Sequence, residues 1–283
     1  MNRFAVITGG TKGLGNQLVR SFWIDGYSLG VVARNHSDIE SVLNELPKRT
    51  NQSFLPLVCD LSDAAKVQHL INDIKAAFSN LDVLVNNAAI QGPIGPLFLN
   101  DIKEWQQTHQ VNLLAPVALC QGLIPLLKKS SGASIINLSG GGATKPRENF
   151  SAYATAKAGL VRFSETIAEE LKDDGIRVNC IAPGPMKTLM LEELLRKSFY
   201  AGEREVALAS EVFANGGASM NHVAELALFL ASDASIGITG KLISAVWDNW
   251  MEWPQNLDEL TKSDVYTLRR IAGRDRGFEW GDK

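Results

Sequence analysis

A glycine-rich turn between an apolar strand and a helix constrains the fold of this chain more than any other stretch. Residues 4–7 (FAVI) read as a short buried strand, residues 8–15 (TGGTKGLG) follow at once, and an apolar helical pattern begins after them. Glycines at such a junction let backbone amides approach a pyrophosphate, which then sits at the positive end of the helix. A tight turn also needs glycines for steric reasons alone. The position between strand and helix favours a phosphate-binding turn.

Strand-like and helix-like segments alternate along the rest of the chain. Strands are predicted at 28–33, 54–59, 81–85, 134–138, 175–182 and 240–246, and helices at 37–46, 64–77, 153–171 and 224–230. This alternation predicts an α/β fold, a doubly wound parallel sheet of the Rossmann type in three αβα layers. With 283 residues, 45% of them hydrophobic, we expect a single domain over 1–283, with its core at 4–246 and a C-terminal extension at 247–283.

Composition argues against several classes of partner. The formal net charge is -3 and the pI is about 5.9, so no positive field attracts nucleic acid or an anionic membrane. Cys59, Cys120 and Cys180 are scattered, which favours reduced, buried thiols, and the four histidines are equally dispersed, so no metal site is expected. The N-terminus carries no signal-peptide pattern and no apolar stretch is expected to reach membrane-spanning length, which predicts a cytoplasmic protein.

The second predicted strand bears on cofactor choice. It ends in Ala33 and Arg34, at the place where a dinucleotide fold meets the adenosine ribose. An acidic residue there would favour NAD(H). Arg34, together with Lys12 in the glycine turn, suits a 2′-phosphate and favours NADP(H), unless both are solvated surface charges.

Tyr153 and Lys157 form a candidate proton donor. They lie four residues apart, which places both side chains on one face of the predicted helix. A phenol has an unperturbed pKa of about 10, and a neighbouring ammonium is expected to lower that pKa toward the working range. Taken alone, the spacing is more typical of an ordinary surface pair.

Several short motifs then occur in one order along the chain. They are TGxxxGxG at 8–15, Asp60, NNA at 86–88, VNL at 111–113 around Asn112, Tyr153-x-x-x-Lys157, and PG at 183–184. With this order and spacing, over roughly residues 4–245, the chain resembles the short-chain dehydrogenase/reductase family in its short, single-domain form. The resemblance implies an NADP(H)-dependent oxidoreductase that interconverts a ketone and a secondary alcohol, used as a carbonyl reductase.

The resemblance also implies roles for single residues. Tyr153 would be the general acid in reduction or the base in oxidation, Lys157 would lower its pKa and bind the nicotinamide ribose, and Asn112 would hold a relay water. From the residue alone, Asn112 reads as a polar group bonded inside a helix. The implied cofactor-binding residues are Gly9, Thr11, Lys12, Gly13, Leu14, Gly15, Arg34, Asp60, Leu61, Asn86, Asn87, Ala88, Tyr153, Lys157, Pro183, Gly184, Met186 and Thr188.

Two departures from the family pattern stand out. Ala89 follows the NNA motif where the family has glycine. The family commonly has a substrate-orienting serine thirteen residues before the tyrosine, and that position is Gly140 here, with Ser139 beside it. Either Ser139 serves because the loop carries an extra residue, or the position is empty, which would remove one donor to the substrate carbonyl. Of the two, we favour Ser139.

The roles of the segments around the predicted site are less clearly indicated by their sequence. Lys145, Arg147 and Phe150 either face the substrate or belong to an ordinary exposed loop. Residues 189–221 match the family's variable substrate lid and are expected to be the most mobile segment. The helix at 153–171 packs against its copy in family members, which implies a homodimer or homotetramer.

The C-terminal extension contains Trp247, Trp250, Trp253 and Trp280, and the basic residues Arg269, Arg270, Arg274 and Arg276. Packing onto the core or a neighbouring subunit is one explanation. The alternative is closure of a substrate pocket, with the arginines meeting an anionic group. The substrate is expected to be a small molecule with a carbonyl or secondary alcohol. Alternatives for the whole protein are a cofactor-binding regulator with little turnover and, ranked last, a nucleotide-sugar-modifying enzyme.

Overall fold

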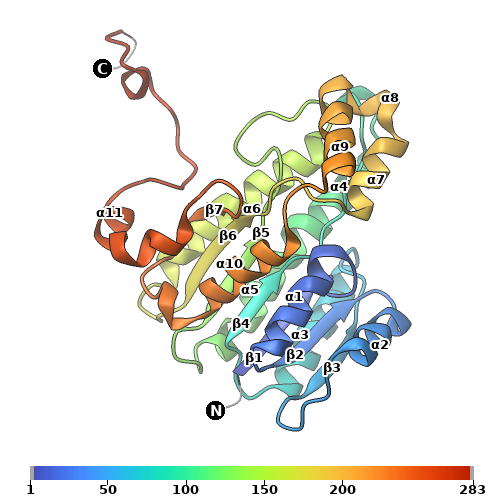
Figure 1. Ribbon diagram of the computed structural model, residues 1–283, viewed down its shortest axis with the longest axis vertical. Coiled ribbons are helices and arrows are strands. Elements are labelled where there is room, and N and C mark those ends of the chain that lie inside the picture. The colour runs from blue at the N-terminus through green and yellow to red at the C-terminus, as the bar shows by residue number, and fades with distance from the viewer. Residues whose placement is uncertain (1–2, 281–283) are drawn as a thin grey trace.

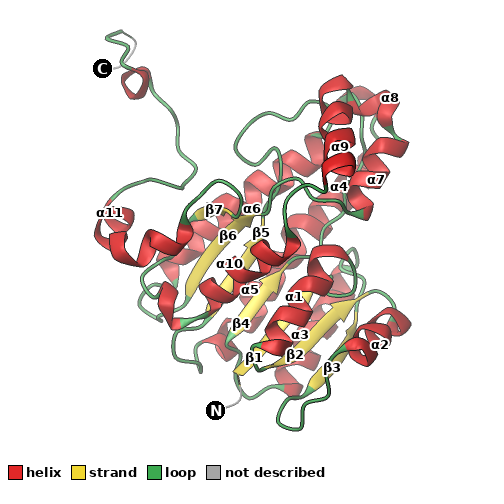
Figure 2. Ribbon diagram, viewed as in Figure 1, coloured by secondary structure: helices red, strands yellow, loops and turns green. Residues whose placement is uncertain are grey.

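A seven-stranded parallel sheet forms the centre of the computed structural model, which describes residues 3–280 (Figures 1 and 2). The last three residues of the predicted extension lie outside this range. The strands are β1 (Arg3–Thr8), β2 (Tyr27–Ala33), β3 (Phe54–Val58), β4 (Val83–Asn86), β5 (Ser134–Leu138), β6 (Arg177–Ala182) and β7 (Leu242–Ser244). Their order is β3-β2-β1-β4-β5-β6-β7, and every neighbouring pair is parallel. The predicted doubly wound sheet is confirmed.

Helices connect the strands and cover both faces of the sheet (Figure 2). They are α1 (Gly13–Ile24), α2 (His36–Glu45), α3 (Ala64–Ala77), α4 (Ile102–His109), α5 (Ala115–Leu127), α6 (Ser151–Glu170), α7 (Leu189–Arg196), α8 (Ser198–Ala201), α9 (Glu203–Asn215), α10 (Met220–Ala231) and α11 (Leu257–Lys262). A π-helical turn, η2 (Gln110–Leu114), joins α4 to α5.

Two hydrophobic cores result from the alternation of side chains along each strand. On β1, Ala5 and Ile7 point into the core that contains α1, α2 and α10, whereas Val6 points into the core that contains α3, α5 and α6. The strands are buried on both sides, which explains their nearly continuous apolar sequences. This arrangement confirms the three αβα layers.

The strand order reverses direction between β1 and β4. From β1 the chain builds outward to β2 and β3, and from β4 it builds the other way to β7. In doubly wound sheets, the loops at the carboxyl ends of the two central strands separate at this point and leave a crevice. The fold therefore places a ligand site after β1 and β4.

One long helix contradicts the expectation that no apolar stretch reaches membrane-spanning length. The continuous helix Ile102–Leu127 is long and apolar enough, by length and composition, to cross a membrane, although no such stretch was expected. Half of its most apolar window is buried inside the fold, as in the core helix of a globular domain. The helix is long and apolar because its α5 part packs against α3, β4 and β5 in the core.

The chain after β7 first packs onto the body of the molecule and then leaves it. Trp250 and Trp253 are buried in the core beside α10, whereas Trp247 and Trp280 are exposed. The backbone N–H of Leu242 on β7 donates to the carbonyl of Tyr266 at 2.8 Å, so the extension pairs with the edge strand. Beyond that contact, the final segment extends away from the sheet (Figure 1).

Candidate active site

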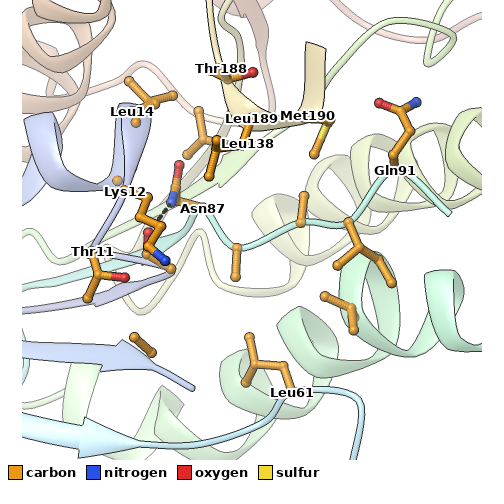
Figure 3. Close-up of a pocket in the computed structure, with 18 of the residues that line it drawn as sticks. Thr11, Lys12, Leu14, Leu61, Asn87, Gln91, Leu138, Thr188, Leu189 and Met190 are labelled. Atoms are coloured by element: carbon orange, nitrogen blue, oxygen red, sulfur yellow. Dashed lines mark hydrogen bonds between the residues drawn. The ribbon is translucent and has the colours of Figure 1, made fainter. Parts of the chain in front are cut away.

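A cleft of about 530 Å³ opens at the carboxyl ends of the strands. Figure 3 shows Thr11 and Lys12 of the glycine turn on one side, Gln91 on the other, and Leu189 and Met190 above. The predicted site residues that line it are Gly9, Thr11, Lys12, Gly13, Leu14, Gly15, Arg34, Asp60, Leu61, Asn87, Ala88, Ser139, Tyr153, Lys157, Pro183, Met186 and Thr188. The ends of the six strands β1 to β6 and the helices α1, α2, α4, α6 and α7 thus supply one continuous surface.

The glycine turn fits a pyrophosphate. Helix α1 begins at Gly13, and no side chain caps its first amides or places an acidic group in its first turn. A Cβ at Gly15 would lie 1.9 Å from the carbonyl oxygen of Gly9, so only glycine permits this tight return of the chain. The Asn87 amide donates to the carbonyls of Thr8 and Gly9, at 2.9 and 3.2 Å, and fixes the turn against β4. Open amides at a helix N-terminus form a natural anion site.

The adenosine end of the cleft carries both expected cations and an acidic residue that the sequence reasoning missed. Arg34 follows β2, and Lys12 lies 3.2 Å from Asp38 on α2. A hydrogen bond from Lys12 is the main cause that lowers the Asp38 pKa, with Asn35 and Arg34 contributing. Asp60 accepts hydrogen bonds from the backbone N–H and the hydroxyl of Ser62, at 3.0 and 2.8 Å.

Tyr153 and Lys157 meet at the other end of the cleft, but their electrostatics differ from the expectation. The Lys157 ammonium lies 5.8 Å from the centre of the Tyr153 ring. Burial raises the pKa of Tyr153, and the cation that opposes this effect is Arg147. The expected lowering of the Tyr153 pKa by Lys157 was therefore wrong for this conformation, because burial has the largest effect on the phenol and the charge that opposes it is that of Arg147.

Lys157 is itself strongly desolvated. Its side chain is 2% exposed, and its ammonium donates to the carbonyl of Leu138 at 2.6 Å. Burial lowers the pKa of Lys157 to about 8, with a small opposing effect from Cys180. Near neutral pH, the amine therefore exchanges protons more readily than a surface lysine does.

The structure shows why residue 140 is a glycine. A Cβ at this position would lie 2.4 Å from the Tyr153 hydroxyl oxygen, so the tyrosine occupies the space that a side chain would need. Ser139 lines the cleft, is 4% exposed, and has a hydroxyl with no hydrogen-bond partner among the described residues. An unpaired buried hydroxyl is costly unless a ligand completes it.

Three predicted residues lie behind the wall of the cleft. Asn112 is fully buried in the π turn, where its side chain accepts from the N–H of Ile90 at 2.9 Å and donates to the same residue's carbonyl at 2.8 Å. Asn86 donates to the side chain of Asn137, and a Cβ at Gly184 would collide with Val246. The side chains of Asn112 and Asn86 thus brace the loop and sheet beneath the site, and a relay water at Asn112 would have to use its backbone.

The segment predicted as a lid packs directly over Tyr153. Leu194, Ala201 and Ala209, from α7, α8 and α9, share one apolar cluster with Phe150 and Tyr153. Phe150 is fully buried and Lys145 is exposed, while Arg147 contacts the lid. None of these three loop residues lines the cleft.

Gln91 is a lining residue that the sequence reasoning missed. It is 3% exposed, and its Nε2 has no partner within residues 3–280. Its only sequence signal is its position shortly after the NNA motif at the end of β4. Gln91 and Ser139 together offer two unpaired polar groups to a ligand.

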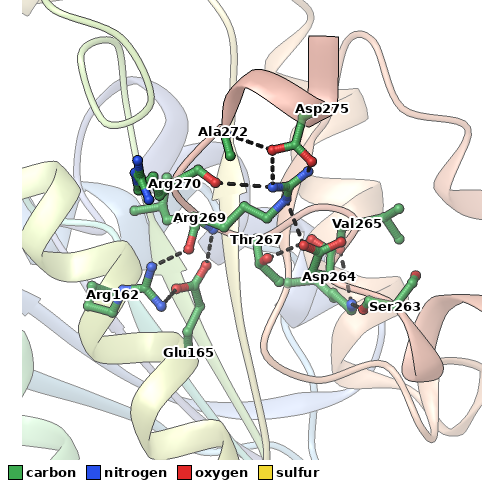
Figure 4. Close-up of polar contacts among 12 residues, drawn as sticks. Arg162, Glu165, Ser263, Asp264, Val265, Thr267, Arg269, Arg270, Ala272 and Asp275 are labelled. Carbon is green, nitrogen blue, oxygen red and sulfur yellow. Dashed lines mark hydrogen bonds and ion pairs between the residues drawn. The ribbon is translucent and has the colours of Figure 1, made fainter. Parts of the chain in front are cut away.

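The arginine-rich extension does not line this cleft within the described part of the chain. Arg269 pairs with Asp264 and Asp275, at 2.6 and 2.7 Å (Figure 4). Glu165 on α6 accepts from the backbone N–H of Leu268 at 2.5 Å, and Arg162 donates to the carbonyl of that residue. These contacts hold the extension against α6, away from the site. Across residues 3–280, no group of three His, Cys, Asp or Glu side chains could hold a metal ion.

Comparison with known proteins agrees with this geometry. The short chain dehydrogenase family model matches residues 3–198. The 3-oxoacyl-(acyl-carrier-protein) reductase FabG of Chlamydia trachomatis is 31% identical over 86% of this chain and 96% of its own length. D-threitol dehydrogenase of Mycolicibacterium smegmatis is 30% identical over 84% of this chain and 89% of its own length.

Solved structures share the fold over most of the chain. YwfH, an NADPH dependent reductase involved in bacilysin biosynthesis, superposes with a TM-score of 0.77 and 27% identity, covering 87% of this chain and 97% of its own. A Shigella flexneri protein complexed with NADP gives a TM-score of 0.73 and 27% identity, covering 87% and 98%. The chain is an NAD(P)-dependent oxidoreductase and belongs to the short-chain dehydrogenase/reductase family.

Proposed function

We propose that this protein is an NADP(H)-dependent carbonyl reductase that interconverts a ketone and a secondary alcohol. One observation carries the proposal. Tyr153, Lys157 and the unpaired hydroxyl of Ser139 all line the same cleft as the glycine turn. An NADPH-dependent reductase among the structural relatives supports the direction.

Each side chain has a defined task in this proposal. A bound nicotinamide cofactor supplies the hydride. Ser139 donates a hydrogen bond to the substrate oxygen and orients the carbonyl, and Tyr153 transfers its hydroxyl proton to that oxygen as the C–H bond forms. Lys157, whose pKa is lowered to about 8, then returns a proton to the phenolate. The net result consumes one hydride and one proton for each carbonyl reduced.

The raised pKa of Tyr153 supports the reductive direction. Burial keeps the phenol protonated at neutral pH, which is the form that reduction requires. Alcohol oxidation would instead need the phenolate, which burial disfavours. We therefore expect oxidation to dominate only at alkaline pH.

The test uses the substitution Tyr153→Phe, which removes the hydroxyl and keeps the ring. NADPH consumption is followed with a panel of ketones that includes acyl thioesters, sugar-derived ketones and small cyclic ketones. We expect kcat to fall by about 100- to 10,000-fold while NADPH affinity is unchanged. Turnover that survives in Tyr153→Phe would overturn the assignment, and tight NADPH binding without turnover by the wild type would favour a regulatory protein.

Preference for NADP(H) over NAD(H) is the second part of the proposal. Arg34 and Lys12 lie at the adenosine end, and Asp38 neutralises part of this charge through Lys12. A 2′-phosphate would compete with Asp38 for that ammonium. We expect Arg34→Ala to weaken NADPH binding by about tenfold with little effect on NADH, and Asp38→Asn to shift the ratio of the two affinities toward NADPH. Equal affinity of the wild type for both cofactors would contradict this part.

We also propose a cytoplasmic homodimer or homotetramer. Ile102 and Leu114 lie on the continuous apolar helix Ile102–Leu127 and are 63% and 50% exposed in the single chain. Their exposure supports burial against a second copy. Light scattering with size-exclusion chromatography measures the assembly, and a monomer at micromolar concentration would contradict the proposal.

A further inference from the structure

Arg147 lies between the proposed proton donor and the lid. Its Nε and Nη2 donate to one carboxylate oxygen of Glu205 on α9, at 3.0 and 2.7 Å. The two side chains are only 16% and 20% exposed, so solvent screens this ion pair less than it screens a surface pair. The guanidinium also lies 3.8 Å from the centre of the Phe150 ring and 5.7 Å from the centre of the Tyr153 ring.

The glycine run at 140–142 makes this arrangement possible. A Cβ at Gly142 would lie 2.7 Å from the Cβ of Ala154 and 3.2 Å from that of Arg147. A Cβ at Gly140 would meet the Tyr153 hydroxyl. The loop therefore closes tightly over Arg147 and Tyr153 together, while the apolar cluster of Phe150, Tyr153 and the lid helices closes from the other side.

The geometry points to Arg147 as a positioning residue for Tyr153, held in place by Glu205 from the lid, so that docking of α9 tunes the acidity of the proposed proton donor. This inference rests on the proposed role of Tyr153. It gives the lid a chemical effect in addition to covering the substrate. An ion pair that spans loop and lid can exist only when α9 is docked, because Glu205 moves with that helix.

The charges around Tyr153 favour Arg147 as the group that responds to the lid. Lys157 is fixed on the same helix and bonded to Leu138, so lid movement leaves it in place. Glu193 and Arg196 on α7 line the cleft, and Glu205 faces Arg147 from α9. Burial raises the Tyr153 pKa, and Arg147 is the charge that lowers it. Loss of Arg147 from this position should therefore make the phenol a weaker acid.

The experiment measures the titration of Tyr153 directly and needs no substrate. The chain has four tyrosines, so replacing them with 3-fluorotyrosine, whose phenol is more acidic, gives a small set of fluorine resonances. The Tyr153→Phe variant assigns the resonance of interest. The titration is recorded for the wild type, Arg147→Gln, Glu205→Ala and the double variant, with and without NADPH.

We expect Arg147→Gln to raise the Tyr153 pKa by about one unit. The sign of the effect of Glu205→Ala is decisive. If Glu205 positions Arg147, its removal releases the guanidinium and the Tyr153 pKa rises, with no further rise in the double variant. If Glu205 only neutralises Arg147, its removal lowers the Tyr153 pKa and overturns the inference, as does an unchanged midpoint in Arg147→Gln.

Two further variants guard the interpretation. Lys197→Gln breaks an exposed lid ion pair, Lys197–Glu193, whose side chains are 43% and 39% exposed, and should leave the Tyr153 titration unchanged. Arg147→Lys keeps the charge but loses the two-donor contact, and should raise the Tyr153 pKa by less than Arg147→Gln does. It takes the place of Arg147→Gln if that variant fails to fold, and it should then still raise the Tyr153 pKa above that of the wild type. Because the titration is independent of turnover, turnover that survives in Tyr153→Phe would remove the proposed function without deciding the electrostatic claim.

Discussion

Different kinds of interaction stabilise the two ends of the cleft. At the glycine turn, the backbone N–H of Gly9 donates to the carbonyl of Val32 at 2.8 Å, and Asn87 donates to the carbonyls of Thr8 and Gly9. At the end near Tyr153, an apolar cluster and the ion pair Arg147–Glu205 connect the loop to the lid helices. The first end is fixed by hydrogen bonds to backbone carbonyls, and the second by side-chain packing and an ion pair between side chains.

We infer from this difference that the cofactor-binding end is rigid, whereas the end near Tyr153 can adjust when the lid moves. Backbone hydrogen bonds at strand ends have little freedom, so the glycine turn is preorganised for a phosphate. Side-chain packing and one half-buried ion pair can rearrange when the lid moves. We therefore expect substitutions at the first end to remove cofactor binding, and substitutions at the second end to change turnover while cofactor binding survives.

Gly15→Ala should give the largest effect on cofactor binding. The new Cβ would lie 1.9 Å from the carbonyl oxygen of Gly9, which is backbone and cannot move aside without disrupting the turn. NADPH affinity should fall by about 100-fold, equivalent to about 2.7 kcal/mol. Fluorescence titration measures the affinity, and the melting temperature shows whether the variant is folded. Near-wild-type affinity in a folded variant would show that the turn does not set binding.

Gly140→Ala tests the other end. The added methyl would displace the Tyr153 hydroxyl, so kcat should fall by about 100-fold while the NADPH dissociation constant stays unchanged. Gly141→Ala is the matched control, because its Cβ would make only ordinary contact, at 3.8 Å, with Arg147. Equal losses in the two variants would mean that loop flexibility, and not the position of Tyr153, limits turnover.

Ser139→Ala should have a smaller effect, confined to chemistry. Losing one donor to the substrate oxygen should lower kcat by about 10- to 100-fold. Because the hydroxyl has no partner among residues 3–280, the melting temperature should not fall. Ser134→Ala is a matched control, since its hydroxyl is likewise buried and unpaired at the opposite end of β5. Activity that falls equally in both variants would argue against a role for Ser139 at the substrate.

The last expected effect concerns the dependence of stability on pH. The Lys157 pKa is about 8 in the folded chain against an ordinary value of 10.5, so between these limits the unfolded chain binds more protons. The free energy of unfolding contributed by this group should therefore rise with pH from about 8 to about 10.5. Denaturant unfolding of the wild type and Lys157→Met over this range should show the rise only in the wild type. Parallel curves would contradict the low pKa.

Local patterns predicted most of the first end and part of the second. Glycine spacing, the strand ends at Arg34 and Asp60, and Asn87 and Ala88 of the NNA motif named residues that the structure places on the cleft. Asn112 and Gly184 carry the same kind of motif signal but do not line the cleft, because a motif gives a position along the chain and not what packs around that position. Asp38 and Gln91 carry no motif signal and were missed.

The chain's sequence by itself determined the sheet, the family and the segments that meet at the cleft, because strand periodicity and glycine turns act over a few residues. Only the tertiary structure decided the sign of the Tyr153 pKa shift, the filling of the space beside residue 140 by the Tyr153 hydroxyl, the pairing of Arg147 with Glu205, and the position of the extension away from the cleft. These depend on burial and on contacts between segments far apart in sequence, where desolvation and charge are set by what packs around a group.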